Sequence, residues 1–259
     1  MSFKTIARSD PKYFNLTQFT ATAIMIWALF QSYSWQWWAA GYLAYFVTGC
    51  LGVTVTFHRY LTHRSYQLPK ALEYIFSFFG AMGGTGSSIG WSSVHFLHHK
   101  FSDKLGDPHS PQGYGMKEWF PTFEIPAKPI FALKHLYTDK FHMFLHRYYY
   151  WLLLSWGAFI SLAFGATAFV FLFAMPIFFQ MWTMTLSNFG NHKLGWGYRT
   201  YNTNDNSVNS WWLAILFWGE GWHNNHHAEP RNWSFNRKWW EFDMSGQVIK
   251  LVRTNKHEA

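Results

Sequence analysis

Two long stretches of the chain carry no charged side chain. No Asp, Glu, Lys or Arg appears from Tyr13 through Phe57, and a second uncharged run extends from Tyr148 to His192. A helix rises about 1.5 Å per residue and needs about 20 residues to cross a bilayer, so each run is long enough for two spans with a tight turn between them. The pattern predicts two transmembrane hairpins. Their four helices are placed at about residues 16–32, 37–57, 149–164 and 168–186.

The segments outside the hairpins are predicted to be helical and to lie at the membrane surface. Residues 68–89 are apolar but carry Lys70 and Glu73 and are interrupted by glycines, so a half-inserted or interfacial hairpin fits better than a further span. The glycines are consistent either with a flexible loop or with close helix packing. Residues 128–147 and 238–256 mix apolar and charged positions, and both are predicted to contain interfacial amphipathic helices.

Composition and charge indicate one membrane-embedded domain. Of the 259 residues, 49% are hydrophobic and only 13% are charged, which is too little charge for an ordinary soluble protein. Because each hairpin returns to the side it left, all 21 Lys and Arg fall on one side of the membrane, and positive residues mark the cytoplasmic side. We therefore expect a single all-α, multi-pass membrane domain over residues 1–259. Both termini and a helical cap should be cytosolic.

Candidate chemistry is concentrated in three histidine motifs. GEGWHNNHH, from Gly219 to His227, and HFLHH both place histidines at i, i+3 and i+4, so their imidazoles share one face of a helix and can converge on a metal. HRYLTH places two histidines five apart, a weaker helical match, which suggests that the helix ends or bends between them. The eight histidines are His58, His63, His95, His98, His99, His223, His226 and His227.

This is more histidine than one metal requires. A zinc hydrolase uses about three protein ligands, so the three motifs leave room for two metals. Imidazole suits iron, copper and zinc alike, which leaves the metal open. One such motif alone is as readily structural as functional, but three together indicate a metal centre. His192, with Asn188 four residues before it at the end of the last predicted span, is a candidate ninth ligand.

Nearby carboxylates could orient these ligands. Asp103 and Asp107 follow HFLHH, and Glu220 lies inside GEGWHNNHH. Metal-bound histidines usually donate their second ring nitrogen to a carboxylate or carbonyl, so all three are candidates for that role. Asp107 also precedes proline, and a turn alone could explain it. His142 and His146, four apart in the predicted surface helix, lack a third partner and are interpreted as interfacial histidines.

A metal pair with neutral nitrogen ligands at the mouth of a helix bundle suits oxygen activation better than hydrolysis. Breaking an unactivated carbon–hydrogen bond requires a strongly oxidising centre, and two iron atoms can share the electrons for it. The protein would tune such a centre through the partners of its ligands. A bundle with an apolar interior can admit a long acyl chain and leave its polar head at the cytosolic face.

The motifs together resemble those of the membrane-bound fatty acid desaturases, particularly the delta-9 acyl-CoA and acyl-lipid group. HRYLTH is followed by RSY, HFLHH by KFS, and these precede DPH (Asp107 to His109) and GEGWHNNHH, in family order. The resemblance covers most of the chain from about Val53 onward, and such a combination is highly specific. It implies oxygen-dependent removal of two hydrogens from a saturated long-chain acyl group to leave a cis double bond, at delta-9.

The resemblance also implies roles for single residues. The eight motif histidines and His192 would be nine direct ligands of two iron ions, and Asn188 would reach one metal through water. Trp91 matches a tryptophan that helps to bend the acyl tunnel. Met184 stands in that tunnel where the family has threonine, and Thr85 stands where it has glutamine, so the double-bond position is left open. Zinc could replace iron in a recombinant sample.

The implied reaction needs O2 and two electrons from outside. No haem-binding or flavin domain is recognisable in the sequence, so a separate ferredoxin or b-type cytochrome is expected to deliver the electrons. The net charge of +8 is attributed mainly to the positive-inside bias and to anionic lipid headgroups, and secondly to docking of an acidic carrier. The acyl group could be carried on CoA, on a carrier protein or in a membrane lipid. No nucleic-acid partner is expected.

Two other classes of protein compete with this interpretation. A related di-iron hydroxylase or ketolase acting on a lipid or carotenoid would share the histidine clusters, although GEGWHNNHH and DPH argue against it. A metal-binding transporter or sensor is the other class. A transporter should place ionisable groups near the middle of the membrane, and the uncharged runs contain none of Asp, Glu, Lys or Arg.

Overall fold

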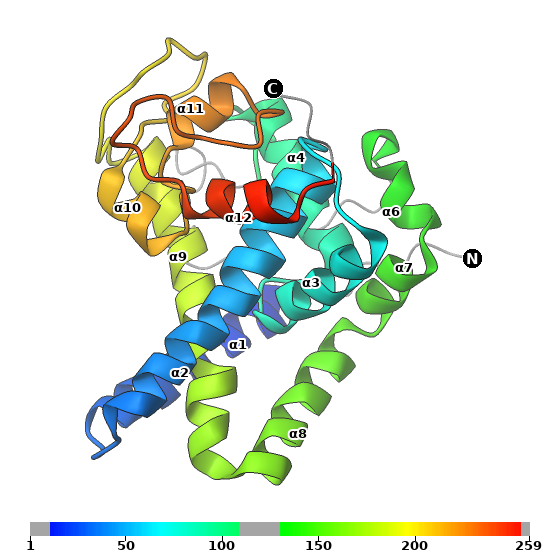
Figure 1. The fold of residues 1–259 in the computed structure, drawn as a ribbon, viewed down its shortest axis with the longest axis vertical. Helices are drawn as coiled ribbons and strands as arrows, with labels where there is room; N and C mark the ends of the chain where they lie inside the picture. Colours follow the sequence, from blue (N-terminus) through cyan, green and yellow to red (C-terminus); the bar gives the residue numbers. More distant parts are fainter. Residues whose placement is uncertain (1–10, 109–129, 255–259) are drawn as a thin grey trace.

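The computed structural model describes residues 11–108 and 130–254, and the regular secondary structure in those ranges is helical, apart from two isolated β-bridges (Figure 1). His109, the last residue of the DPH motif, lies outside the described residues. The all-α prediction is confirmed for the described chain. Its helices are α1 (Pro11–Leu29), α2 (Trp35–Tyr45), η2 (Phe46–Thr62), α3 (Lys70–Met82), α4 (Ser88–Phe101), η4 (Phe131–Leu133), α6 (Lys134–Thr138), α7 (Lys140–Arg147), α8 (Tyr149–Phe169), η5 (Val170–Ala174), α9 (Met175–His192), α10 (Trp211–Leu216), α11 (His223–Ala228) and α12 (Met244–Val252).

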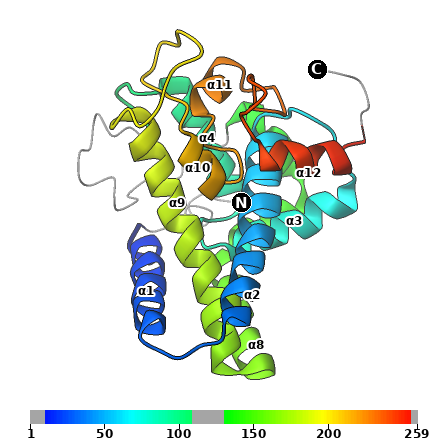
Figure 2. The same cartoon turned by 60° about the vertical axis from the view of Figure 1, so that its left-hand side comes forward.

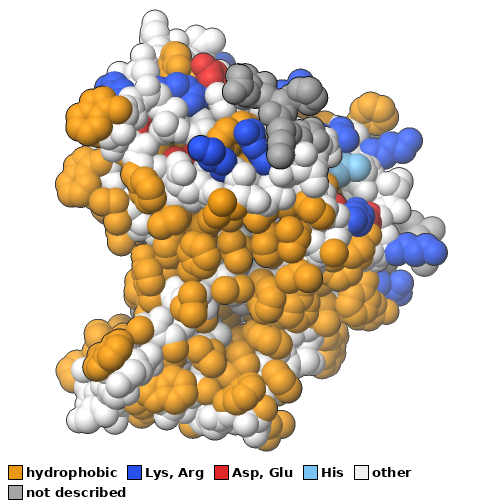
Figure 3. Space-filling model, viewed as in Figure 1, with side chains coloured by type: hydrophobic (Ala, Val, Ile, Leu, Met, Phe, Trp, Pro, Cys, Tyr) orange, Lys and Arg blue, Asp and Glu red, His pale blue; other side chains and the backbone are white. Residues whose placement is uncertain are grey.

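The long apolar helices form a stem below a cap of shorter helices. In Figure 2, α1 descends and a loop leads back up through α2, with α9 lying between these two helices, while α8 and α9 form a second hairpin. Two continuous helical stretches, Trp35–Thr62 and Tyr149–His192, are long and apolar enough to cross a membrane. The second reverses direction at Gly165, whose φ of 86° is open to glycine at little cost. Figure 3 shows the stem covered by apolar side chains, with the charged side chains around the cap.

The stretch that carries HRYLTH is a π-helix, η2, continuous with α2. The backbone N–H of His63 donates to the carbonyl of His58, five residues earlier, and the Thr62 hydroxyl does the same to Phe57. A π-helix closes i to i+5 hydrogen bonds, so residues five apart stack on one side. The predicted helix end is found at Thr62. The spacing that looked weak for an α-helix therefore suits this helix well.

The glycines near the end of α3 and in the turn after it serve two purposes. A Cβ atom on Gly52 would lie 2.3 Å from the Cα of Gly80, so α3 packs against η2 backbone to backbone. Gly84 and Gly86 have φ of 87° and 101° and form the turn that leads into α4. The close-packing interpretation is therefore confirmed at Gly80, whereas Gly84 and Gly86 form a defined turn. The turn aims α4, which carries HFLHH, at the end of η2.

The prediction of one surface helix over residues 128–147 is wrong for the part that the structure describes. The chain forms two short helices, α6 and α7, which break at Asp139, the N-cap of α7. The interfacial assignment of His142 and His146 is also wrong, because both side chains are buried. His142 contacts Ser88 on α4 and Glu73 on α3. An amphipathic pattern does not reveal which face packs against protein.

Candidate metal centre

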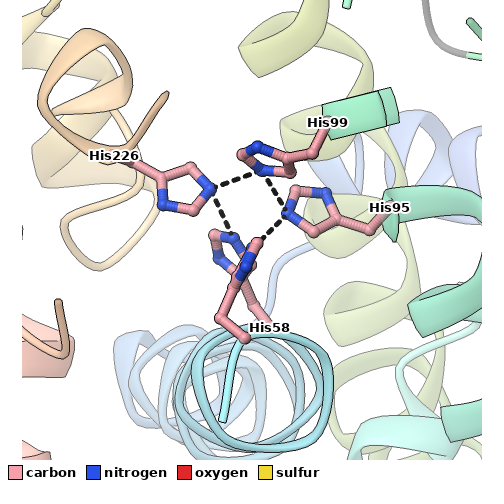
Figure 4. A group of neighbouring side chains, drawn as sticks. His58, His95, His99 and His226 are labelled. Atoms are coloured by element: carbon pink, nitrogen blue, oxygen red, sulfur yellow. Dashed lines mark hydrogen bonds between the residues drawn. The ribbon is translucent and has the colours of Figure 1, made fainter. Parts of the chain in front are cut away.

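All nine predicted histidines come together beneath the cap, in two groups. In each group the candidate ligand atoms lie within 4.8 Å of one another. Figure 4 shows four members of the larger group, His58, His95, His99 and His226, with their rings directed toward a common point. The larger group is His58, His63, His95, His99 and His226, and the smaller is His98, His192, His223 and His227.

The histidines of α4 and of α11 are divided between the two groups. On α4, His95 and His99 are four residues apart and join the larger group, while His98, about 100° around the helix from His99, joins the smaller. On α11, His223 and His227 are four apart and join the smaller group, while His226 joins the larger. Each of these two helices therefore contributes to both groups, which fixes the groups side by side.

The Nε2 atoms face inward in both groups. In the larger group the Nε2 of His226 lies 3.0 Å from that of His58 and 2.8 Å from that of His99. In the smaller group the Nε2 of His223 lies 2.9 Å from that of His192. Nitrogen ligands sit about 2.1 Å from a metal, so neighbouring ligands at right angles are about 3 Å apart. The spacing therefore suits two groups of nitrogen ligands around metal ions.

The opposite ring nitrogen of four histidines contacts a carboxylate. Asp107 lies 3.0 Å from the Nδ1 of His98, and Asp103 lies 3.0 Å from that of His192. Glu220 forms the same contact with the Nδ1 of His58. A carboxylate accepts, so each Nδ1 must carry the hydrogen and each Nε2 is left with a lone pair. Asp103, Asp107 and Glu220, all singled out from the sequence, thus contact candidate ligands.

Asp205 is the fourth carboxylate, and sequence reasoning missed it. It lies 2.8 Å from the Nδ1 of His227. It also accepts from the backbone N–H and hydroxyl of Ser207, a local turn contact typical of any loop aspartate. The Nε2 atoms of His98 and His227 are 3.3 Å apart, and when the rings are neutral both carry lone pairs because both Nδ1 atoms donate. That contact is repulsive unless a cation lies between them, so the donor set fits a metal.

Removing the Asp205 carboxylate is expected to weaken metal binding. An Asp205→Asn variant should lose about 10- to 100-fold in metal affinity, because its amide cannot provide the same acceptor charge to His227. Metal titration of purified, metal-free protein measures this. The matched control is Glu229→Gln, because Glu229 pairs with Arg237 and is 44% exposed. Equal affinities for wild type and Asp205→Asn would show that the hydrogen bond is not needed.

Burial keeps six of the nine histidine rings neutral. It holds the pKa of His63, His95, His99, His223 and His226 well below the usual value, and neighbouring histidines lower it further. Burial also lowers the pKa of His227 to about 4, although Asp205 opposes the shift. Neutral imidazoles present lone pairs at neutral pH, which is the form that binds metal.

These pKa values predict that the metal-free protein becomes less stable as the pH falls. An unfolded histidine takes up a proton near pH 6.5, whereas folded His227 does so only near pH 4. Between these values the unfolded state binds more protons, so stability decreases as pH falls through this window and is not changed by these groups above it. Thermal unfolding of chelator-treated protein should show similar midpoints at about pH 8 and 7.5, and lower ones at about pH 6 and 5. Equal midpoints at about pH 7.5 and 5 would contradict the assignment.

A pocket runs between η2 and α9 to the histidines. Its lining includes members of both groups, His58 and His95 from the larger and His223 from the smaller. Trp91 and Met184, the two residues assigned to the acyl tunnel, both line it, and Trp91 stacks on His95 with ring centroids 4.8 Å apart. Asn188 also lines the pocket, one helical turn before His192. Thr85 is buried in the turn between α3 and α4.

Three further lining residues were not predicted from the sequence. Tyr45, Thr183 and Trp218 form part of the wall, and the Tyr45 hydroxyl donates to Thr183. Trp218 has a positive φ of 60°, in the loop that leads into GEGWHNNHH. That backbone conformation is uncommon for a bulky residue, and the sequence carries no signal for it. The pocket wall depends on contacts between segments far apart in the chain.

The fold and the site define a class, namely a helical membrane protein with a histidine-rich metal site. The family model described as fatty acid desaturase matches residues 34–246. The chain is therefore a member of the fatty acid desaturase family, and it is an oxidoreductase that desaturates fatty acyl groups.

Curated relatives agree with this membership. The chain is 38% identical over 230 residues to sn-1 stearoyl-lipid 9-desaturase of Synechocystis sp., which covers 86% of this chain and 70% of that protein. It is 36% identical to sn-1 stearoyl-lipid 9-desaturase of Anabaena variabilis, covering 86% of this chain and 82% of that protein. It is 35% identical to the chloroplastic palmitoyl-monogalactosyldiacylglycerol delta-7 desaturase of Arabidopsis thaliana, and this match covers 85% of this chain and 61% of that protein.

Proposed function

We propose that the protein inserts a cis double bond at delta-9 of a long-chain saturated fatty acyl group, using O2 and a di-iron centre. The observation that carries the proposal is the arrangement of nine inward-facing imidazoles in two groups beside a pocket lined by Trp91 and Met184. The 9-desaturase names of two relatives support the delta-9 position. A third relative, 35% identical to this chain, is named a delta-7 desaturase. The position of the double bond is therefore the part of the proposal that most needs testing.

The two histidine groups would each hold one iron. His58, His63, His95, His99 and His226 are assigned to one ion, and His98, His192, His223 and His227 to the other. Two bound irons would supply the oxidising power that an unactivated alkyl chain requires. Asn188 would reach one ion through water, and the four carboxylates keep the imidazoles in the tautomer that exposes Nε2. Zinc could occupy the same ligands in a purified sample.

The pocket is proposed to hold the acyl chain with its reacting carbons beside the histidines. Trp91 stacks on His95, so a chain that contacts Trp91 passes within reach of both groups. Met184 takes the place of a family threonine on the facing helix and presents a flexible apolar side chain. An apolar wall excludes water and orients the chain through contacts along its length, which is how a positioned substrate gains rate.

A separate protein is proposed to supply the electrons. The reaction takes two hydrogens from the acyl chain, one O2, two electrons and two protons, and it yields one double bond and two waters. A ferredoxin or a b-type cytochrome is the proposed donor. The net charge of +8 favours approach of an acidic carrier, since complementary charge accelerates association.

The proposed topology has four spans in two hairpins, with both termini and the metal centre cytosolic in a single domain. The apolar stem and the charged cap in Figure 3 support it. The Lys and Arg residues gather at the cap end, as the positive-inside rule requires of the cytoplasmic face. Long-chain acyl groups in CoA, carrier protein or lipid form would all present their heads at this face.

Product analysis tests the proposed reaction. The protein is expressed in a host fed with deuterated stearate, and the fatty acids are separated by gas chromatography with localisation of double bonds. A labelled cis-9 monoene that depends on expression is the expected result. An oxygenated product would show that the reaction is hydroxylation or ketolation and not desaturation. Unchanged stearate, with two irons per chain and a reductant system present, would overturn the proposal.

A further inference from the structure

A second pocket lies on the charged side of the molecule and shares no lining residue with the pocket beside the histidines. It is a cavity of about 190 Å³ bounded by the end of η2, the loop that follows it, the start of α3, and α6. Its lining includes two aromatic residues, Tyr60 and Tyr66, and three charged ones, Arg64, Lys70 and Glu73. The proposed desaturation reaction makes no use of these side chains.

Hydrogen bonds fix the walls of this pocket. The Tyr60 hydroxyl donates to Glu73 at 2.8 Å, and the Tyr66 hydroxyl donates to the carbonyl of Val55 at 3.0 Å. The Nε2–H of His135, on α6, donates to the carbonyl of Leu61 at 3.1 Å. The cavity is therefore formed in advance by residues that are held in place, which is a requirement of a binding site.

The charges in the pocket are not balanced. Glu73 accepts from Tyr60, from His142 at 3.0 Å and from Lys70 at 2.6 Å, so its charge is compensated within the fold. Lys70 pairs with Asp139 as well. Arg64 differs, because within residues 11–108 and 130–254 no carboxylate lies at ion-pair distance from its guanidinium. A guanidinium presents paired donors that match the oxygens of a phosphate or carboxylate.

The backbone of Arg64 adds a second reason to assign it a role. Its φ is 54°, and it is the second residue after η2 ends at Thr62, next to the C-cap His63, a position where glycine is common. Of the described residues other than glycine, two more have positive φ, Asp103 and Trp218. Asp103 contacts His192, and Trp218 lines the pocket beside the histidines. Arginine retained at a position that favours glycine indicates that its side chain is needed.

The surroundings favour a lipid as the ligand. Phe131, one turn before His135, is 87% exposed, and Lys134 and Lys140 are exposed on α6 and α7. Figure 3 shows Lys and Arg side chains gathered on the side where α6 and α7 lie, bordering the apolar surface. A headgroup phosphate would reach the cations while its acyl chains follow the apolar side. We propose that this pocket binds the phosphate of an anionic membrane lipid, with Arg64 as the contacting residue.

Binding of short-chain lipids tests the proposal. Purified full-length protein in neutral detergent is titrated calorimetrically with dihexanoylphosphatidylglycerol, dihexanoylphosphatidylcholine and inorganic phosphate. Dihexanoylphosphatidylglycerol should bind, and Arg64→Gly should weaken its binding by more than about tenfold, because hydrogen bonds to a charged group are lost. Glycine suits the backbone at this position, so the variant should fold at least as well as wild type. Arg231→Gly, which removes the same side chain from an exposed turn, should bind as wild type does.

Each other outcome decides between sources or rejects the site. If inorganic phosphate binds as tightly as dihexanoylphosphatidylglycerol, and Arg64→Gly abolishes the binding of both, the site binds oxyanions but the lipid assignment is overturned. If dihexanoylphosphatidylcholine binds as tightly as dihexanoylphosphatidylglycerol, the proposal is rejected. It is also rejected if Arg64→Gly and Arg64→Gln bind dihexanoylphosphatidylglycerol as wild type does. If the wild-type protein binds none of the three probes, the proposal is rejected as well.

Discussion

The His226→Ala variant is expected to lose desaturase activity by more than about 100-fold and to bind less than two irons per chain. Loss of an outer partner of a ligand already costs about 10- to 100-fold, so loss of a ligand should cost more. His226 is fully buried, and its Nε2 lies 3.0 Å from that of His58 and 2.8 Å from that of His99. Alanine would leave this group with four histidines and a gap between those two.

Two readouts separate metal loss from misfolding. Iron per folded chain is measured on the monodisperse fraction, and product is measured by gas chromatography of host lipids. His146→Ala is the matched control, since His146 is also buried, contacts Ser87 and is a member of neither histidine group. A His226→Ala enzyme with full iron content and wild-type turnover would remove His226 from the metal centre.

The Arg59→Met variant is expected to have the largest effect on stability, a loss of about 3–5 kcal/mol, because it leaves buried carboxylates without their partner. Arg59 is fully buried and donates to both oxygens of Asp243, at 2.7 and 3.0 Å, and to Glu220 at 2.9 Å. Its guanidinium also lies 3.6 Å from the ring centroid of Phe235. Since Glu220 contacts His58, the loss should reach the metal centre as well.

Heat resistance and metal content in detergent measure the two effects. Arg59→Lys keeps the charge but cannot serve both carboxylates at once, so it should recover only part of the stability. Adding Asp243→Asn to Arg59→Met removes one stranded charge and should restore part of the loss. An Arg59→Met protein as heat-resistant as wild type would show that the ion cluster contributes no net stability.

Local sequence determined the helical nature of the chain and the position of its candidate chemistry. Uncharged runs and the i, i+3, i+4 spacing of the motifs depend on neighbours within a few residues. Both α4 and α11 are helical as that spacing implies, although each divides its three histidines between the two groups. HRYLTH was harder, because η2 is a π-helix, which the α-helical spacing rule does not predict, and it packs closely against α3 at Gly52 and Gly80. The three nearest carboxylates could be named because each lies close in sequence to a histidine motif.

Only the tertiary structure decided which distant residues meet. The division of nine histidines into groups of five and four follows from how α4 and α11 face η2 and α9. Asp205 reaches His227 across 22 positions, and Arg59 reaches Asp243 across 184. The burial of His142 likewise depends on α3 and α4. Hydrophobic patterning states that a face will be covered, but the shape of the packed helices selects what covers it.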